Sequence, residues 1–523
     1  MSKNIVLCSD GTGNQDIKNR GTNVFKLYEA VDIQGHKTDG NNKQQVAFYD
    51  DGVGTSRIPF VKFLGGACGW GFSRNVKKLY HELINVYEEE DSIYLFGFSR
   101  GAYTVRALAG FIQWCGIINK EEENIDKKID KSWSEFKRET FSRNYFSTRR
   151  GFIPPEKDEK TIFRETVQRR EQYNEINPNQ KIIIKFIGVW DTVGAIGVPS
   201  DVLRAIINFF YPIWFSDNTL GRDIESACHA LSIDDERRTF YPELWNEKDG
   251  KEERIKQVWF AGVHSNVGGG YPKQGMSLVT LDWMMNEATK AGLRFIDNDI
   301  CFVKKHQDVH DKLYDSRSGA GLYYRWEPRD ISKICEEHKI KTPKIHISVF
   351  ERIACGTANY APGNIPFDFE IDATSSLQYA WPTEPRRHAV QNEIENKTKA
   401  YLAHQTQTKT KTKTSTSLLD QMKGTIILGK FSYYTFLVLT VLFISSLINN
   451  PTFRKAVPGL IQKHGIGDLC SLLLKCSIWE ILPIYVLCGG LIALLANLVD
   501  SCLEKKYRGF WHELRERLRI LLS

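Results

Sequence analysis

The feature that most constrains this chain is an apolar segment that ends in a turn of small residues around a serine. Residues 93–98 read IYLFGF, and Ser99, Arg100 and Gly101 follow directly. The pattern is G-x-S-x-G between an expected strand and an expected helix, which is the sequence of a nucleophile elbow. Gly97 and Gly101 leave room for this sharp turn, because side chains there would meet neighbouring backbone. Ser99 is therefore the candidate nucleophile.

Other short apolar runs also stop at turns that are rich in glycine and polar residues. They are residues 4–9, 45–49, 181–190 and 257–263. Helical stretches lie between such runs, and this alternation predicts a mostly parallel sheet wrapped by helices. The active sites of such sheets lie at the carboxyl ends of the strands. The expected fold is therefore α/β, of the α/β-hydrolase type, with residues 1–400 as the catalytic domain.

A serine hydroxyl becomes a good nucleophile only when a base accepts its proton and an acid orients that base. Asp191 and His264 each follow an expected strand, and His264 begins a glycine-rich loop. The order Ser, Asp, His is that of α/β-hydrolase triads. His229 and His388 are the rivals of His264, and a structural role is the simpler interpretation of both. For Asp191 the alternative is a carboxylate that caps a turn.

The tetrahedral intermediate of ester cleavage needs backbone N–H groups that stabilise its oxyanion. The amide of Arg100, at the start of the expected helix, is the first candidate. Gly11 or Thr12, in the glycine-rich loop 10–14, is the second. The same loop resembles the D-x-D-G-T motif of aspartate-nucleophile phosphatases, but Cys8 replaces the first aspartate. A phosphatase would therefore lack its nucleophile.

Charge and cysteine content argue against several other functions. Lys and Arg number 70 against 63 Asp and Glu, and the net charge of +7 is too dispersed to predict a nucleic-acid partner. The 11 cysteines form no C-x-x-C pair, which favours a reducing compartment over a disulfide framework or a zinc site. The first residues hold no apolar run long enough for a signal peptide. We therefore expect a cytosolic domain that uses no metal and no cofactor.

Two polar regions interrupt the alternation of strands and helices. Residues 119–180 mix Lys, Arg, Glu and aromatic residues without a strand-like run. This predicts a helical insertion, either a lid or a solvated helical hairpin. Residues 401–424 contain alternating Thr and Lys, a composition typical of a linker. We therefore expect the folded catalytic unit to end near His404.

Two long apolar runs follow the linker and predict a transmembrane hairpin at residues 425–500. Residues 431–448 and 481–499 each approach the roughly 20 residues that cross a bilayer. Two buried helices of a soluble domain would instead carry polar residues at helical spacing. Basic residues are frequent outside the two runs and sparse between them, which predicts that both ends are cytoplasmic. Residues 501–523 form a basic amphipathic tail, which either lies on an anionic leaflet or packs as an ordinary helix.

Six ordered motifs give the chain a family resemblance. They are LCSDGTGN at 7–14, NV at 75–76, GFSRGAYTVR at 97–106, VWDTVG at 189–194, HAL at 229–231 with DERR at 235–238, and VHSNVGGGY at 263–271. Over residues 5–281 the chain resembles the α/β-hydrolase domain shared with type VI secretion phospholipase effectors, a Tle-type lipase catalytic domain. The resemblance implies a lipase-like site that acts on glycerophospholipid acyl esters without a metal. It assigns the triad roles to Ser99, Asp191 and His264.

Two residues depart from the pattern of that family. Asn266 stands where an aspartate usually follows the His-Ser pair, and Ser9 stands where an aromatic residue commonly precedes the first-loop aspartate. Neither change removes a member of the triad. Asn266 removes a negative charge beside the expected base, and Ser9 changes the residues that line the pocket.

The sequence thus predicts a serine ester hydrolase, anchored in a membrane, that cleaves membrane phospholipid in the manner of a phospholipase A. Two alternatives stay open. An acyltransferase or protein deacylase would use the same triad but a different acyl acceptor or acyl donor. A catalytically idle hydrolase fold would instead serve as a membrane scaffold or sensor.

Overall fold

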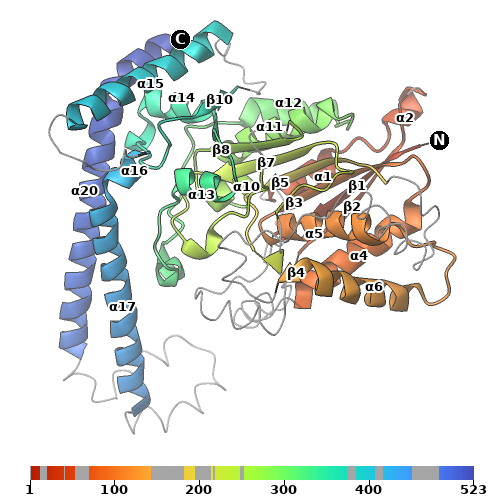
Figure 1. The fold of residues 1–523 in the computed structure, drawn as a ribbon, viewed down its shortest axis with the longest axis horizontal. Coiled ribbons are helices and arrows are strands. Elements are labelled where there is room, and N and C mark those ends of the chain that lie inside the picture. The colour runs from red at the N-terminus through yellow and green to blue at the C-terminus, as the bar shows by residue number, and fades with distance from the viewer. Residues whose placement is uncertain are drawn as a thin grey trace.

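The fold is seen in a computed structural model of the chain. It describes residues 2–11, 21–40, 42–52, 70–142, 182–194, 214–215, 218–247, 253–373, 384–406, 416–449 and 482–522. Within these ranges the main feature is a sheet of eight strands in the order β10-β9-β8-β7-β5-β3-β1-β2. Every pairing in this sheet is parallel (Figure 1). The expected α/β fold is confirmed.

The strands include all five that the sequence predicts and three more. They are β1 (Asn4–Ser9), β2 (Gln45–Asp50), β3 (Ser92–Phe98), β5 (Ile184–Trp190), β7 (Ala227–Ser232), β8 (Ile255–Phe260), β9 (Lys344–His346) and β10 (Glu370–Asp372). A separate antiparallel pair joins β4 (Phe141–Ser142) to β6 (Trp214–Phe215). Because β1 lies between β2 and β3, the strand order reverses there, and ligands of open α/β sheets bind at such switch points.

Helices cover both faces of the large sheet (Figure 1). The helices of the domain are α1 (Asn23–Ala30), α2 (Gly35–Thr38), α4 (Trp70–Val86), α5 (Arg100–Cys115), α6 (Ile125–Thr140), α10 (His264–Gly268), α11 (Gly275–Lys290), α12 (Asp297–His306), α13 (Ile331–Glu337), α14 (Ile347–Cys355) and α15 (Glu384–Thr406). α4, α5 and α6 lie on one face, and α1, α11 and α12 lie on the other. Strands covered on both faces are typical of parallel sheets.

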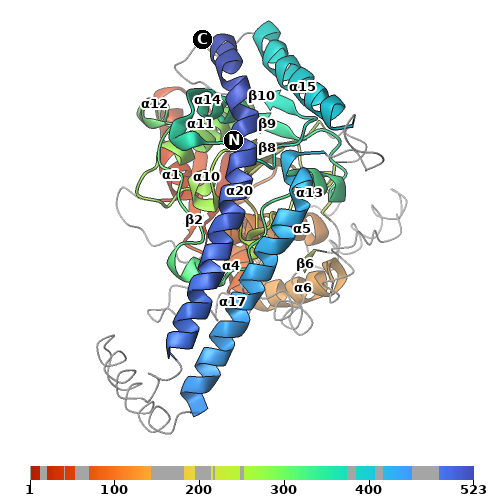
Figure 2. The same ribbon diagram turned by 90° about the vertical axis from the view of Figure 1, so that its left-hand side faces the viewer.

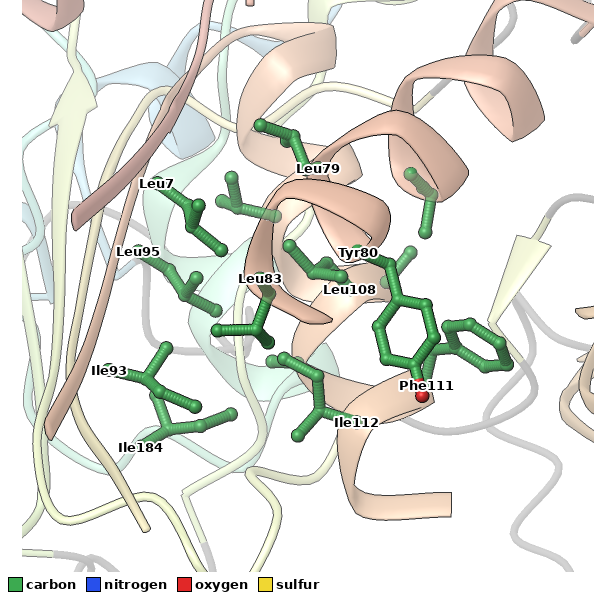
Figure 3. Close-up of a cluster of buried hydrophobic side chains, with 14 of the residues drawn as sticks. Leu7, Leu79, Tyr80, Leu83, Ile93, Leu95, Leu108, Phe111, Ile112 and Ile184 are labelled. Carbon is green, nitrogen blue, oxygen red and sulfur yellow. The ribbon is translucent and has the colours of Figure 1, made fainter. Parts of the chain in front are cut away.

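Alternate side chains of the central strands enter two separate hydrophobic cores. Leu7 and Leu95 pack with Leu83 and Leu108 of α4 and α5 (Figure 3). Phe96, the next residue of β3, points to the other face and joins the core beneath α1 and α11. This alternation follows from the two-residue period of a strand. Burial on both faces fixes the register of β1 and β3, and with it the position of the turn after β3.

The described part of the expected insertion at 119–180 packs into the first core. It comprises α6 and β4, while residues 143–180 lie outside the described residues. Trp133 and Phe136 of α6 are buried against Phe111 of α5, with ring centroids 5.2 and 5.4 Å from it. α6 therefore packs one face on the first core, and its opposite face is exposed.

Two long helices extend away from the domain (Figures 1 and 2). They are α17 (Lys423–Asn449) and α20 (Leu482–Leu522), which follow the short helix α16 (Leu418–Gln421). By length and composition both are able to cross a membrane, and only 17% and 11% of their most apolar windows are buried. α15 runs through Thr406 and α16 lies before α17, so parts of the range 401–424 are helical rather than linker. Residues 407–415 lie outside the described part of the chain.

The end of α20 belongs to the domain rather than to the hairpin alone. Trp511, Leu514 and Leu518 are 2%, 0% and 0% exposed in a third core, against α14 and α15. The indole of Trp511 donates to the carbonyl of Pro362 at 2.8 Å. The described part of the tail, residues 501–522, is therefore a packing helix. This differs from the expectation that the folded unit ends near His404, because the third core lacks three central side chains without α20.

Candidate active site

The turn after β3 holds Ser99 in a backbone conformation that strains most side chains. Its φ is 59° and its ψ is −120°, and α5 begins at the next residue. A Cβ added to Gly97 would lie 2.6 Å from the Cα of Ala102. A Cβ added to Gly101 would lie 2.1 Å from the carbonyl oxygen of Ser9. These close approaches account for both glycines, and the turn presents the serine hydroxyl at the carboxyl edge of the sheet.

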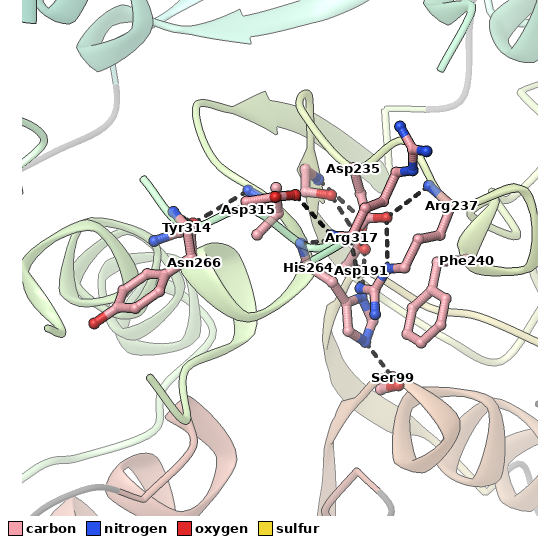
Figure 4. Close-up of polar contacts among 12 residues, drawn as sticks. Ser99, Asp191, Asp235, Arg237, Phe240, His264, Asn266, Tyr314, Asp315 and Arg317 are labelled. Atoms are coloured by element: carbon pink, nitrogen blue, oxygen red, sulfur yellow. Dashed lines mark hydrogen bonds and ion pairs between the residues drawn. The ribbon is translucent and has the colours of Figure 1, made fainter. Parts of the chain in front are cut away.

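A chain of hydrogen bonds links Ser99 to two other predicted site residues (Figure 4). His264 Nε2 lies 2.8 Å from Ser99 Oγ, and His264 Nδ1 lies 2.6 Å from Asp191 Oδ2. All three residues are buried. His264 is the first residue of α10, and Asp191 directly follows β5. Three residues that are far apart in the sequence thus meet at the carboxyl ends of three parallel strands.

The carboxylate of Asp191 is held by a buried arginine. Arg329 donates to both carboxylate oxygens at 2.7 and 2.8 Å, and the amide of Ser232 donates to Oδ1 at 3.0 Å. Burial alone would raise the pKa of Asp191, but the charge and hydrogen bonds of Arg329 outweigh it and hold the pKa well below its usual range. Asp191 is therefore ionised at neutral pH. Arg329 lies in a region without a motif, so sequence reasoning missed it.

Two aromatic rings enclose the imidazole of His264. Its centroid lies 4.6 Å from the ring of Phe98 and 4.9 Å from the ring of Phe240, which meets it edge-on. Burial lowers the pKa of His264, and the hydrogen bond to Asp191 opposes this shift without cancelling it. The imidazole is therefore neutral at pH 7, the form that accepts a proton.

The loop that carries His264 is fixed by a second carboxylate. Asp235 accepts a hydrogen bond from the backbone N–H of His264 at 3.2 Å. Asp235 also forms an ion pair with Arg237 at 2.6 Å, and the Arg237 guanidinium lies 3.5 Å above the ring of Phe240. Through Asp235 and Arg237, these contacts connect the backbone of His264 to the ring of Phe240. In the sequence, Asp235 and Arg237 appear only within a family motif, and Phe240 lies outside it.

Comparison with known proteins assigns the chain to a family. A family model described as T6SS, Phospholipase effector Tle1-like, catalytic domain, matches residues 3–287, more than half of the chain. The chain belongs to this Tle1-like family. An uncharacterized protein of Saccharomyces cerevisiae is 27% identical over 254 residues, which are 46% of this chain and 32% of that protein. The chain thus matches about a third of the length of that relative.

Two solved structures are more distantly similar to the chain. An uncharacterized protein from Pseudomonas aeruginosa has a TM-score of 0.35 at 16% identity, over 83% of this chain and 66% of that one. The Tle1 effector, bound to the VgrG spike of the type 6 secretion system, has a TM-score of 0.30 at 12% identity. That match covers 65% of this chain and 84% of the effector chain.

The matched part of this Tle1-like chain stops before some residues that support the site. Arg329 lies beyond residue 287, as do α17 and α20. The matched region therefore supplies Ser99, Asp191 and His264, and a later segment supplies the cation that neutralises the acid.

The two backbone N–H groups that we expect to bind an oxyanion differ in their hydrogen bonding in this Tle1-like domain. The backbone of Arg100 begins α5, at the end of a helix where N–H groups lack intrahelical acceptors. The amide of Gly11 instead donates to the carboxylate of Asp10 at 2.5 Å. Tyr49 donates to the same carboxylate at 2.7 Å. The N–H of Gly11 is therefore already bonded to Asp10 in this conformation. Thr12 lies outside the described residues.

The two histidines that rivalled His264 in the sequence have no hydrogen bond to Ser99 among the described contacts. His229, on β7, accepts a hydrogen bond from the amide of Thr192 at 3.0 Å through Nε2. Burial, with the charge of Arg106, lowers the pKa of His229 to about 3, so it stays neutral. It supports the segment after Asp191. His388 is exposed on α15.

Asn266 has a positional role that an aspartate cannot fill. Its amide nitrogen donates to the carbonyl of Lys312 at 3.0 Å, and its oxygen accepts from the amide of Tyr314 at 3.2 Å. A carboxylate only accepts hydrogen bonds, so it would lose the first contact. The departure from the family pattern thus joins the His264 loop to the segment around residues 312–314.

Proposed function

We propose that this Tle1-like domain is a serine ester hydrolase that cleaves acyl esters of glycerophospholipids. Ser99 is the nucleophile, His264 the general base and Asp191 the acid that orients it. The observation that carries the proposal is the continuous chain of contacts from Ser99 Oγ through His264 and Asp191 to Arg329. The substrate class follows from membership of a phospholipase family.

In the acylation step, Ser99 Oγ attacks the ester carbonyl and passes its proton to His264 Nε2. Asp191 accepts the Nδ1–H bond and stabilises the imidazolium that forms. The amide of Arg100, at the start of α5, is the proposed donor to the oxyanion, with the helix dipole adding to its effect. When the intermediate collapses, His264 returns the proton to the departing glycerol oxygen.

In the deacylation step, a water molecule replaces the lysophospholipid. His264 accepts a proton from this water while the hydroxide attacks the acyl-serine carbonyl. Collapse of the second intermediate releases a fatty acid, and the proton returns to Ser99 Oγ. Phe98 and Phe240 flank the imidazole, so the base lies in an apolar environment.

We further propose that α17 and α20 cross the membrane, with the catalytic domain and the C-terminus in the cytoplasm. Large apolar side chains such as Phe431, Val441 and Leu487 are exposed along these helices, and such surface is stable in lipid. The hairpin is fixed to the domain, because Lys430 pairs with Glu327 at 2.7 Å. A tether of this kind keeps the site at a high effective concentration of lipid.

A product analysis on vesicles tests the hydrolase proposal. The full chain is reconstituted with defined phosphatidylethanolamine and phosphatidylcholine, and released lipids are identified by mass spectrometry. We expect free fatty acid and lysophospholipid in equal amounts from the intact chain, and neither from Ser99→Ala. Acyl groups found on another acceptor would indicate an acyltransferase. If a fluorophosphonate probe fails to label the intact chain at Ser99, the fold is catalytically idle.

A further inference from the structure

A cavity of about 800 Å³ lies where α17 and α20 meet the catalytic domain. We name it the junction cavity. Its walls come from residues 233–236, from the loop around 313–329, and from facing turns of the two helices. Figures 1 and 2 show these helices leaving the domain side by side. Asp235 and Arg329 belong to the wall, whereas Ser99 is not among the described lining residues, so the junction cavity lies behind the proposed triad.

The end of the junction cavity nearest the domain has an excess of negative charge. Glu236, Asp315 and Asp500 line it together with Arg317. Glu236 accepts a hydrogen bond from the indole of Trp326 at 3.0 Å and lies 3.6 Å from Arg317. Burial, with the charge of Asp500, raises the pKa of Glu236 to about 7 against the attraction of Arg317. An added cation would relieve this repulsion.

The other cations of the wall are already paired. Arg508 lies 2.7 Å from Glu504, and Arg329 is bound to Asp191. Arg317 remains for the carboxylates, and its side chain is 21% exposed. This end of the junction cavity therefore has carboxylates for a cation and a partly exposed guanidinium for an anion, side by side.

The opposite end of the junction cavity is apolar. It is lined by Leu322 of the loop, by Phe436 of α17, and by Gly489, Ile492 and Ala493 of α20. A Cβ added to Gly489 would meet no atom within 4 Å, so the space beside this helix is open. The junction cavity thus has the amphipathic character of a phospholipid, with a zwitterionic end at the domain and an apolar end along the proposed membrane helices.

We propose that the junction cavity binds one membrane glycerophospholipid with an ammonium head group, at a site separate from Ser99. The ammonium faces the carboxylates of Glu236 and Asp500, whose charge favours a cation. The phosphate accepts from Arg317, and an acyl chain lies in the apolar part of the junction cavity, along the sides of α17 and α20. The proposal rests on the proposed membrane insertion of these helices, because the lipid enters the apolar end from the bilayer.

Photo-crosslinking in vesicles tests this proposal. Full-length Ser99→Ala, which keeps the junction cavity intact, is reconstituted in phosphatidylglycerol with a small fraction of photoactivatable phosphatidylethanolamine. We expect crosslinks in the peptides around residues 313–326 and 489–497. Unlabelled phosphatidylethanolamine or phosphatidylcholine should compete, since both carry an ammonium, and added phosphatidylglycerol should not. Crosslinks confined to the peptide around Ser99, or equal competition by phosphatidylglycerol, would overturn the proposal.

Matched variants test the two ends of the junction cavity. Glu236→Gln keeps the acceptor for Trp326 but removes the charge, and Ala493→Phe fills the apolar end. Each should lower crosslinking on the order of tenfold. Glu516→Gln and Leu494→Phe change positions of α20 that are not among the described lining residues of the junction cavity, and they should leave crosslinking unchanged. Melting temperatures identify variants that misfold. If a variant misfolds, the positions of the crosslinks in full-length Ser99→Ala still test the proposal.

The outcome is separable from that of the hydrolase proposal. Crosslinking uses a chain without the serine hydroxyl, so it does not depend on turnover. Crosslinks in the junction cavity together with no ester hydrolysis by the intact chain would overturn only the proposed function. Normal hydrolysis together with no crosslink in the junction cavity would overturn only the lipid site.

Discussion

The guanidinium of Arg329 donates one hydrogen bond to each carboxylate oxygen of Asp191, at 2.7 and 2.8 Å. Both side chains are fully buried. Arg329 also donates to the backbone carbonyls of Ser232 and Phe240, so the cation is held from several sides. Its neighbour in the sequence, Glu327, pairs with Lys430 of α17. The arginine that holds the acid of the proposed triad is thus two residues away from a contact between the domain and the hairpin.

Arg329→Gln should therefore impair catalysis by altering Asp191 and His264. Without the guanidinium, the Asp191 charge acts more strongly on His264 and raises its pKa. The acid limb of the activity profile should move to higher pH, and activity should fall on the order of 10²-fold as the carboxylate loses its position. Ester hydrolysis against pH measures both effects.

Arg352→Gln is the matched control for this substitution. Arg352 is also 1% exposed, but it donates to the carbonyls of Val309 and Asp311, away from the triad. Its loss should lower stability and leave the pH profile in place. Identical profiles for the two variants would show that Arg329 is merely structural.

The second prediction concerns the proposed triad as a unit. Ser99→Ala and His264→Ala should each lower hydrolysis of a soluble ester by about 10³-fold or more, because each member is needed by the others. Asp191→Asn should also be less stable by about 3–5 kcal/mol, since it leaves Arg329 buried without a counter-charge. Denaturant unfolding measures that loss. Near-normal turnover by His264→Ala would point to another base.

The pH dependence of the intact chain follows from the burial of His264. The pKa of His264 is lowered, and only the neutral imidazole accepts the proton of Ser99. Activity should therefore be full at neutral pH and fall only as the pH drops below the usual histidine value of about 6.5. The quantity to measure is kcat/KM on a soluble ester, which reports the free enzyme. An acid limb centred above pH 7 would contradict this.

The turn after β3 gives a steric prediction. Gly101→Ala places a Cβ 2.1 Å from the carbonyl oxygen of Ser9, so the turn must move and activity should fall on the order of 10²-fold. Gly110→Ala, on the same helix, brings a Cβ only to 3.4 Å from Phe136 and should stay active. Probe labelling at Ser99 and turnover together measure the effect. Equal activity of both variants would mean that the turn tolerates a side chain.

The last prediction concerns the end of α20. Leu514→Ala removes a fully buried side chain from the third core and should cost about 2–5 kcal/mol of the free energy of unfolding. Ile520→Ala, at a position that is 74% exposed, should change it little. A chain that ends at His404 should be less stable than either, because it lacks the whole of α20. A stable, monomeric 1–404 chain would show that the third core forms without it.

Much of the fold was predictable because the signals are local. Apolar runs that stop at turns rich in glycine and polar residues predicted β1, β2, β3, β5 and β8, and the central strands among them are continuously apolar because they are buried on both faces. β7 was not predicted, because its sequence, ACHALS, combines small residues with a histidine. The apolar runs that became α17 and α20 were recognisable from composition alone.

The sequence by itself determined the turn around Ser99, because the need for Gly97 and Gly101 is a steric property of a few adjacent residues. It also placed Asp191 and His264 at strand ends, where parallel pairing brings side chains to one edge. Only the tertiary structure decided that Arg329 neutralises Asp191, across 138 residues of chain, and that the end of α20 completes the third core. Such contacts depend on which distant segments pack together, and this is settled by burial across the whole fold rather than by any local pattern.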